Sequence, residues 1–270
     1  EVIREHHHIG GTSRTTFFSN FLQTLCRRGG EYKTRPLRSI SVGACLSYSR
    51  RCTCYPNGNT TRKNPNLVAI IRSHDNGSTW EIPRNITEQI YSLFDSGNPI
   101  EAAFVGGGKI FQSRTVKKGK YYRVYAALTA RPNGNRVIYT DDFGATWHAL
   151  GGAFALPVPG GDEPKCEEMP DGRVIISSRV GGGRLYNIYT YTNTLEGIGE
   201  WETSVKCTFA GSGLTPGNNA TNVEILIVPV KRNSDQKEMY LALQSLPTGS
   251  TRTKGLHRNI FAVRIRIYSY

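Results

Sequence analysis

The chain has 270 residues, enough for one large domain with a substantial hydrophobic core. The formal net charge is +13, and residues 1–63 alone hold eleven Lys or Arg against three Glu. No basic helix and no basic–aromatic motif occurs, so we expect no nucleic-acid partner. No apolar run reaches about 18 residues, so we also expect no membrane-spanning segment.

Residues 1–63 are interpreted as an atypical basic N-terminal segment. They are rich in Arg, Ser, Thr and Cys, contain no Asp, and show no sustained period typical of a strand or a helix. The opening letters EVIREHHHIGG lack the basic start and apolar block of a signal peptide. We interpret His6, His7 and His8 as a surface tract or an expression remnant.

The six cysteines form no recognisable framework. Cys52 and Cys54 lack the spacing of zinc ligands, and no paired set of Cys or His follows them. We therefore expect no metal, no cofactor and no disulfide. The remaining cysteines are Cys26, Cys45, Cys166 and Cys207.

From Asn64 onward the sequence becomes regular, with β-branched and aromatic runs separated by turns rich in Gly, Pro and Asn. One short helix is expected over residues 85–94, NITEQIYSLF, with Asn85 as its cap. The expected strands cover residues 67–72, 101–105, 109–114, 121–128, 136–140, 173–178, 185–191, 223–230 and 239–245.

Two stretches repeat one pattern, SHDNGSTW at 73–80 and TDDFGATW at 140–147. Each follows a strand-like run and predicts a tight hairpin corner. Asp75 and Asp142 are suited to accept hydrogen bonds from the backbone of the turn, and a Gly supplies the positive φ. Each Trp, Trp80 and Trp147, then begins the return strand with an apolar face to bury. These residues are therefore expected to be structural.

A third, degenerate corner is expected between residues 192 and 201. Sheets of about four strands at such spacing are typical of propeller blades, so the pattern predicts an all-β protein with a repeated sheet unit.

The two corners resemble the Asp-boxes of sialidases (neuraminidases), and the segment GGDEPKCEEMPDGRVIISSR at 160–179 resembles the sialidase motif in which a Glu precedes a strand ending in Arg. The resemblance covers residues 64–254. It implies a six-bladed β-propeller, incomplete in this chain, that removes terminal α-linked sialic acid from glycans. Further stretches that resemble the family are 98–104, 108–114 and 216–222.

The resemblance also implies roles for three residues. Sialidases use a Tyr nucleophile, which avoids placing a carboxylate against the anionic sugar. A phenol with a pKa near about 10 needs a base beside it, and the match implies that Glu163 is this base. Arg179 and Arg252 match two of the three arginines that bind the substrate carboxylate in this family.

Each assignment has a plain structural alternative. Glu163 could form only a salt bridge with a neighbouring Lys, and Arg179 could be a surface charge at a strand end. Arg252 lies in a Gly/Ser/Thr loop and has the weakest local signature. Glu167 and Glu168 are expected to be solvated, and either a pocket-lining or a strand-surface role is open for Gln112 and Arg114.

Three pieces of the family pattern are missing. No Arg-Ile-Pro motif occurs before Asp75, since TRPLRS at 34–39 is too poor a match, so the first arginine that binds the substrate carboxylate is unassigned. No Asp occurs before Asp75 either, so the acid/base Asp is also unassigned. Tyr268 and Tyr270 lie 16 and 18 residues after Arg252, closer than the nucleophile of the family. The nucleophile is also unassigned. We interpret residues 1–63 and 255–270 as divergent, truncated or out-of-frame ends.

The sequence therefore predicts an exo-α-sialidase whose partners are sialylated glycans. A trans-sialidase and a catalytically inactive sialoglycan-binding propeller are the alternatives, and a propeller scaffold for protein interactions is a third. Sequons at Asn59, Asn76, Asn85 and Asn219 suit surface loops of a secreted, cell-surface or lysosomal protein.

Overall fold

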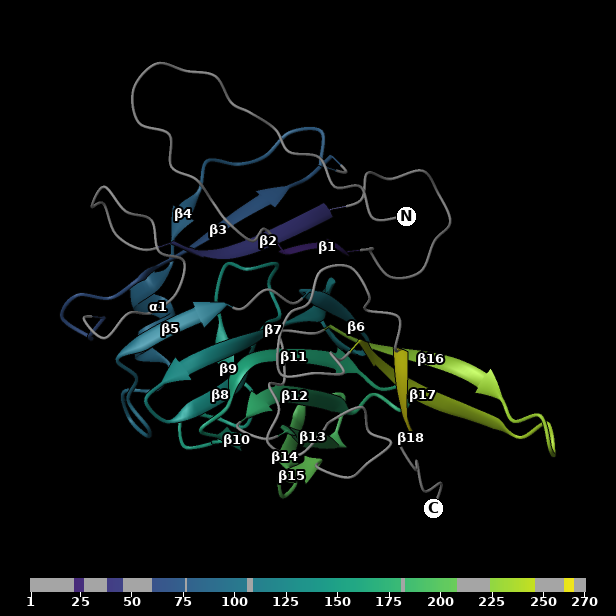
Figure 1. Cartoon of the computed structure of the whole chain (residues 1–270). Helices are drawn as coiled ribbons and strands as arrows, with labels where there is room; N and C mark the ends of the chain where they lie inside the picture. The colour runs from purple at the N-terminus through teal and green to yellow at the C-terminus, as the bar shows by residue number, and fades with distance from the viewer. Residues whose placement is uncertain are drawn as a thin grey trace, which may run out of the picture.

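The computed structural model describes residues 60–75, 77–105, 109–180, 183–207 and 224–245, together with strands at 22–26, 38–45 and 260–264. In these residues the chain forms antiparallel sheets that follow one another along the sequence, as Figure 1 shows from the purple and blue first sheet to the yellow-green last one. Within the described residues, one short helix lies beside the first two sheets.

The strands of the first two sheets are β1 to β10. The first has the order β1-β2-β3-β4, and the second has the order β10-β8-β7-β5 with β6 on β7 and β9 on β8. Their strands are β1 (Leu22–Cys26), β2 (Arg38–Cys45), β3 (Leu67–Ser73), β4 (Arg84–Asn85), β5 (Ala102–Val105), β6 (Phe111–Lys118), β7 (Tyr121–Arg131), β8 (Gly134–Thr140), β9 (His148–Ala149) and β10 (Val158–Pro159).

The third sheet has the order β11-β12-β13-β14 with β15 on β13, and the fourth has the order β16-β17-β18. Successive antiparallel sheets of this size are typical of propeller blades. The prediction of an all-β, incomplete propeller is therefore confirmed, whereas the number of six blades stays a prediction. The strands are β11 (Asp162–Glu168), β12 (Val174–Val180), β13 (Gly183–Asn193), β14 (Ile198–Trp201), β15 (Val205–Cys207), β16 (Ile225–Lys231), β17 (Glu238–Ser245) and β18 (Ile260–Arg264).

All nine predicted strands are present, with ends that differ by up to four residues. Three strands outside the regular part of the sequence were not predicted: β1, β2 and β18. β2 pairs along its length with β3, and β18 pairs with β17. The division of the chain at residues 63 and 254 stays a prediction.

The helix α1 (Thr87–Ser92) is shorter than the predicted 85–94. Its N-cap is Ile86 and not Asn85, which belongs to β4. The Asn85 side chain still supports the turn, because its Oδ1 accepts a hydrogen bond from the backbone amide of Thr87 at 2.9 Å. No helix in the described residues is long and apolar enough to cross a membrane.

The core consists of apolar layers between successive sheets. Along β7, Val124, Ala126 and Leu128 pack toward the first sheet, whereas Tyr125 and Ala127 pack toward the third. Side chains of a strand point alternately to the two faces of its sheet. The sheet is therefore apolar on both faces, and its strands read as nearly continuous apolar runs.

The same arrangement continues in the third sheet. Val174 and Ile176 of β12 join the layer beside the second sheet, and Ile175 between them joins a smaller layer with Ile225 of β16. Cys166, a free thiol, lies fully inside the first of these layers. Burial raises its pKa well above the usual value.

The two repeated corners have the same hydrogen bonds. In the second, Asp142 Oδ1 accepts hydrogen bonds from the Thr140 hydroxyl and the Thr146 amide, both at 2.8 Å. Asp142 Oδ2 accepts one from the Thr146 hydroxyl at 2.6 Å, and the Gly144 amide donates to Thr140 Oγ1 at 2.8 Å. Gly144 has φ +79°, which favours glycine.

The first corner repeats these bonds through Asp75. Its two carboxylate oxygens accept hydrogen bonds from Ser73 and Thr79 at 2.5 to 2.8 Å. The two tryptophans differ, however. Trp147 is buried as expected, whereas Trp80 is 38% exposed and donates to the carbonyl of Gly77. The expectation of burial is therefore wrong for Trp80.

The predicted third corner is a hairpin between β13 and β14 with different bonds. The Asn193 side chain accepts a hydrogen bond from the amide of Glu196, and the Thr192 hydroxyl donates to the carbonyl of Ile198. In this hairpin the side chain that accepts the hydrogen bond of the turn is Asn193, whereas in the two repeated corners it is an Asp.

We predict that Asp142→Ala lowers the free energy of unfolding by about 1–2 kcal/mol, because it removes the acceptor of the hydrogen bonds that shape the corner. Urea unfolding of the variant and the parent chain measures this. Asp95→Ala is the control, since the Asp95 side chain is half exposed and makes only a 3.4 Å ion pair. An equal effect of both substitutions would contradict the structural role of Asp142.

We predict that the contribution of Asp75 to stability depends on acid pH. Hydrogen bonds from the hydroxyl and then the amide of Thr79 lower the pKa of Asp75 to about 2, against about 3.9 in an unfolded chain. The contribution is therefore complete above about pH 4 and disappears as the pH falls toward about 2. In urea unfolding at several pH values, the difference between the parent and Asp75→Asn should narrow below pH 4. A constant difference would refute this.

Candidate functional site

The candidate site lies at the start of β11 and the end of β12. Asp162 pairs with Arg179 and Lys165 pairs with Ser177, so β11 has one more residue than β12 between these two pairs. This is a β-bulge, a feature that re-aims side chains and is common beside active sites. The bulge contains Glu163 and explains why Pro164 is tolerated inside a strand.

Glu163 has a backbone conformation that is uncommon for a residue with a side chain, with φ +42°. Holding such a residue in place costs about 1–3 kcal/mol, and the surrounding structure must impose it. Part of this structure is Gly161, where a Cβ atom would come within 3.0 Å of Val158, Asn135 and Ser178. The close packing at Gly161 places the bulge directly against the second sheet.

The bulge brings Glu163 and Arg179 together. Glu163 Oε2 lies 3.0 Å from Arg179 Nε, and the side chain of Glu163 is only 7% exposed whereas that of Arg179 is 34% exposed. The two groups form an ion pair without an aligned hydrogen bond. A buried carboxylate thus touches a guanidinium that reaches solvent.

Two further charged residues complete this cluster, and sequence reasoning missed both. Asp162 Oδ2 accepts a hydrogen bond from Arg179 Nη2 at 2.8 Å. The same oxygen lies 3.1 Å from Nη2 of Arg131, at the end of β7 in the second sheet. Asp162 stands next to Glu163 in the motif, but Arg131 is 48 residues before Arg179, and no local pattern links them.

Two buried cationic side chains, Arg184 and Lys165, lie on the strands that carry this ion pair or beside them. Arg184 is fully buried, pairs in register with Arg179, and donates from Nε to Ser177 Oγ at 2.9 Å. Lys165 is 1% exposed. Burial lowers the pKa of both, for Lys165 to about 8, although the nearby Glu163 carboxylate opposes the shift.

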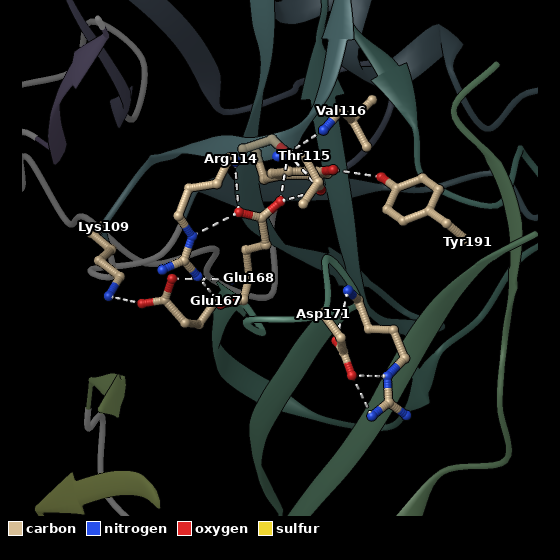
Figure 2. A network of polar contacts seen from close by, with 11 residues as sticks. Lys109, Arg114, Thr115, Val116, Glu167, Glu168, Asp171 and Tyr191 are labelled. Carbon is tan, nitrogen blue, oxygen red and sulfur yellow. Dashed lines mark hydrogen bonds and ion pairs between the residues drawn. The ribbon is translucent and has the colours of Figure 1, made fainter. Parts of the chain in front are cut away.

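Glu168 is also buried, and here the expectation that Glu167 and Glu168 are solvated is wrong. Figure 2 shows the Glu168 carboxylate within a network of donors from β6. Its oxygens accept hydrogen bonds from the Arg114 amide at 2.7 Å, from Thr115 Oγ1 at 2.9 Å and from the Ser113 hydroxyl. Glu168 therefore joins the second and third sheets.

Arg114 and Glu167 make further contacts in this network, and the role of Gln112 and Arg114 in a pocket stays a prediction. The Arg114 guanidinium binds Glu168 through Nε and Nη2, so Arg114 cross-links two sheets while its side chain stays 62% exposed. Glu167 forms an ion pair with Lys109 (Figure 2), whose ammonium also donates to the carbonyl of Ile225. Gln112 lies in β6 and pairs in register with Val124.

Two of the three predicted site residues can be placed. Glu163 and Arg179 meet in one cluster, whereas Arg252 lies outside the described residues, as do Tyr268 and Tyr270. The roles of all three site residues stay predictions.

The described cluster has a chemical character of its own. It joins two arginines from different sheets with one shielded and one accessible carboxylate. Guanidinium groups bind carboxylates and phosphates through paired hydrogen bonds. A shielded carboxylate beside them is suited to accept a proton from a bound group within hydrogen-bond reach. The cluster can therefore hold an anionic ligand next to a base.

No family model matches the chain. Among solved structures, it is similar to a Trypanosoma rangeli sialidase in complex with sialic acid, with 16% identity, a TM-score of 0.49, and coverage of 85% of this chain and 34% of that chain. It is also similar to the Hadza microbial sialidase Hz136, with 19% identity, a TM-score of 0.46, and coverage of 79% and 38%.

A third similar structure is the intramolecular trans-sialidase from Ruminococcus gnavus in complex with oseltamivir carboxylate, with 16% identity, a TM-score of 0.44, and coverage of 84% and 49%. This chain thus spans between 34% and 49% of the length of these three proteins. The solved structures that it is similar to include sialidases and a trans-sialidase, the family that its sequence resembles.

We predict that Lys165→Met raises the free energy of unfolding by about 1–3 kcal/mol at pH 7, because it removes a buried charge. The Lys165 ammonium has no hydrogen-bond partner in the described part of the chain. Its pKa is about 8 in the folded state against an ordinary 10.5. The parent chain therefore gains stability as the pH rises from 8 toward 10.5, and the advantage of the variant should shrink there.

Urea unfolding at pH 7 and pH 10 measures both effects. Lys237→Met is the matched control, because Lys237 is exposed and its side chain should contribute little. If Lys165→Met lowers the free energy of unfolding at pH 7 while Lys237→Met leaves it unchanged, the prediction is wrong. That result would mean that other charges or hydrogen bonds stabilise the buried Lys165 ammonium.

Proposed function

We propose that this chain is part of an exo-α-sialidase that hydrolyses terminal α-linked sialic acid from glycans. In this proposal Arg179 binds the carboxylate of the sugar, and Glu163 is the base that activates a Tyr nucleophile. Arg252 supplies a second guanidinium to the same carboxylate. The observation that carries the proposal is the 3.0 Å contact between Glu163 Oε2 and Arg179 Nε.

The geometry supports this pairing because the two residues have different exposures. Arg179 reaches solvent, as a group that meets a soluble glycan must, whereas Glu163 is almost covered. A guanidinium is charged at every physiological pH and can bind a carboxylate through two parallel hydrogen bonds. Since Glu163 touches Arg179, a sugar held by Arg179 would place its reacting carbon within the reach of groups around Glu163.

The choice of a phenol as nucleophile explains the need for this carboxylate. A carboxylate nucleophile would face the negative charge of sialic acid, whereas a neutral phenol would not. The phenol becomes reactive when a base accepts its proton, and general-base catalysis typically contributes about 10²- to 10⁴-fold to a rate. In the proposal, Glu163 accepts that proton, and Arg179 lies beside it at 3.0 Å.

We predict that the 270-residue chain binds 3′-sialyllactose and not lactose, which ligand-observed NMR can measure. Arg179→Ala should abolish this binding, because it removes a charge that pairs with the sugar carboxylate. Arg173→Ala is the matched control. Arg173 lies just before the same strand and forms a 2.8 Å ion pair with Asp171, but at the opposite end. Equal binding of both sugars, or of neither, would overturn the proposal.

Turnover is measured separately with a fluorogenic sialoside. If the chain is active, Glu163→Gln should lower kcat by about 10²-fold or more while Arg173→Ala leaves it unchanged. Binding of 3′-sialyllactose without turnover would overturn the proposal of hydrolysis and support the alternative of a sialoglycan-binding propeller. Transfer of sialic acid to added lactose would instead identify a trans-sialidase.

A further inference from the structure

Two arginines from different sheets converge on one carboxylate oxygen. Asp162 Oδ2 lies 2.8 Å from Nη2 of Arg179 and 3.1 Å from Nη2 of Arg131. Arg179 is the next-to-last residue of β12 in the third sheet, and Arg131 is the last residue of β7 in the second. The two guanidinium groups thus surround a single position in space, and the side chain of Asp162 occupies it.

This arrangement has the chemistry of a carboxylate-binding site that contains a carboxylate of its own. Paired guanidinium groups are the protein groups best suited to bind a carboxylate. The side chain of Asp162 carries the same functional group as an acidic ligand. A ligand carboxylate can therefore make the same contacts with Arg131 and Arg179 only after Asp162 has moved away.

The exposure of the three side chains makes this exchange feasible. Arg131 is 43% exposed, Arg179 34% and Asp162 24%. Ion pairs that are this accessible are individually weak, because water screens them. The Asp162 carboxylate can thus leave at a small cost, whereas Glu163, which is almost fully buried and contacts Nε of Arg179, stays in place.

We propose that Arg131 is a further arginine of the anion-binding site, beside Arg179, and that Asp162 is an internal competitor that determines which anions the site accepts. A ligand must replace Asp162 on both arginines, so only a carboxylate that can contact both is retained. The identification of this ligand as sialic acid rests on the proposed function. The competition itself depends only on Asp162, Arg131 and Arg179.

The competition reduces the apparent affinity by the fraction of molecules in which Asp162 holds the arginines. With two weak ion pairs, this fraction corresponds to a change in affinity of about three- to tenfold. Asp162→Asn removes the negative charge at the same size. It also keeps an oxygen that can accept the hydrogen bond that the Glu163 amide gives to Asp162 Oδ1 at 2.9 Å.

The experiment compares the full chain with Asp162→Asn, using 3′-sialyllactose, lactose and acetate as probes in NMR titrations. The variant should bind 3′-sialyllactose and acetate about three- to tenfold more tightly, with no gain for uncharged lactose. Asp171→Asn is the matched control, because Asp171 forms a 2.8 Å ion pair with Arg173 at similar exposure. Adding Arg131→Ala to Asp162→Asn should remove the gain.

The outcomes separate this inference from the proposed function. Tighter binding of acetate without binding of 3′-sialyllactose supports the competition and contradicts the sialidase proposal. Binding of 3′-sialyllactose with equal affinity by the parent and Asp162→Asn overturns the competition and leaves the sialidase proposal standing. A gain that persists after Arg131→Ala overturns the role of Arg131. Circular dichroism and thermal unfolding confirm that each variant is folded.

Discussion

The structure depends on one packing constraint: the second and third sheets, which lie between two neighbouring sheets, must bury both of their faces. The alternating side chains of β7 and β12 supply apolar layers to two neighbours at once. Because a buried charge without a partner is costly, charged groups of neighbouring sheets come together in clusters. The candidate site is one such cluster, and the network around Glu168 is another.

The charged cluster around Arg179 and the network around Glu168 have different roles. Around Glu168, donors of β6 in the second sheet bind a buried carboxylate of the third sheet. These hydrogen bonds link the two sheets. Around Arg179, carboxylates and guanidinium groups meet where solvent has access, and in our proposal the Asp162 carboxylate gives way to a ligand while Glu163 stays in place. Rigid links beside an exchangeable cluster are what an anion-binding site requires, since the scaffold keeps its charges in place while a ligand enters.

The bulge in β11 connects the fold to this chemistry. It gives Glu163 a strained backbone and turns it against Arg179, and the close packing at Gly161 holds it there. Strain that is imposed by surrounding packing is a common feature of functional sites. The same bulge leaves Asp162 beside Arg131 of the neighbouring sheet, so one local irregularity creates both the ion pair and its competitor.

The sequence by itself determined the nine regular strands and the two Asp-centred corners, because periodicity and turn chemistry encode them. A local motif singled out Glu163 and Arg179, and the structure brings the two into contact. It did not reveal β11, whose letters DEPKCEE are mostly charged and include Pro. Only the tertiary structure decided that Glu168 is buried and that Arg131 joins Asp162. Both facts depend on contacts between separate sheets, and such contacts leave no periodic trace in the chain.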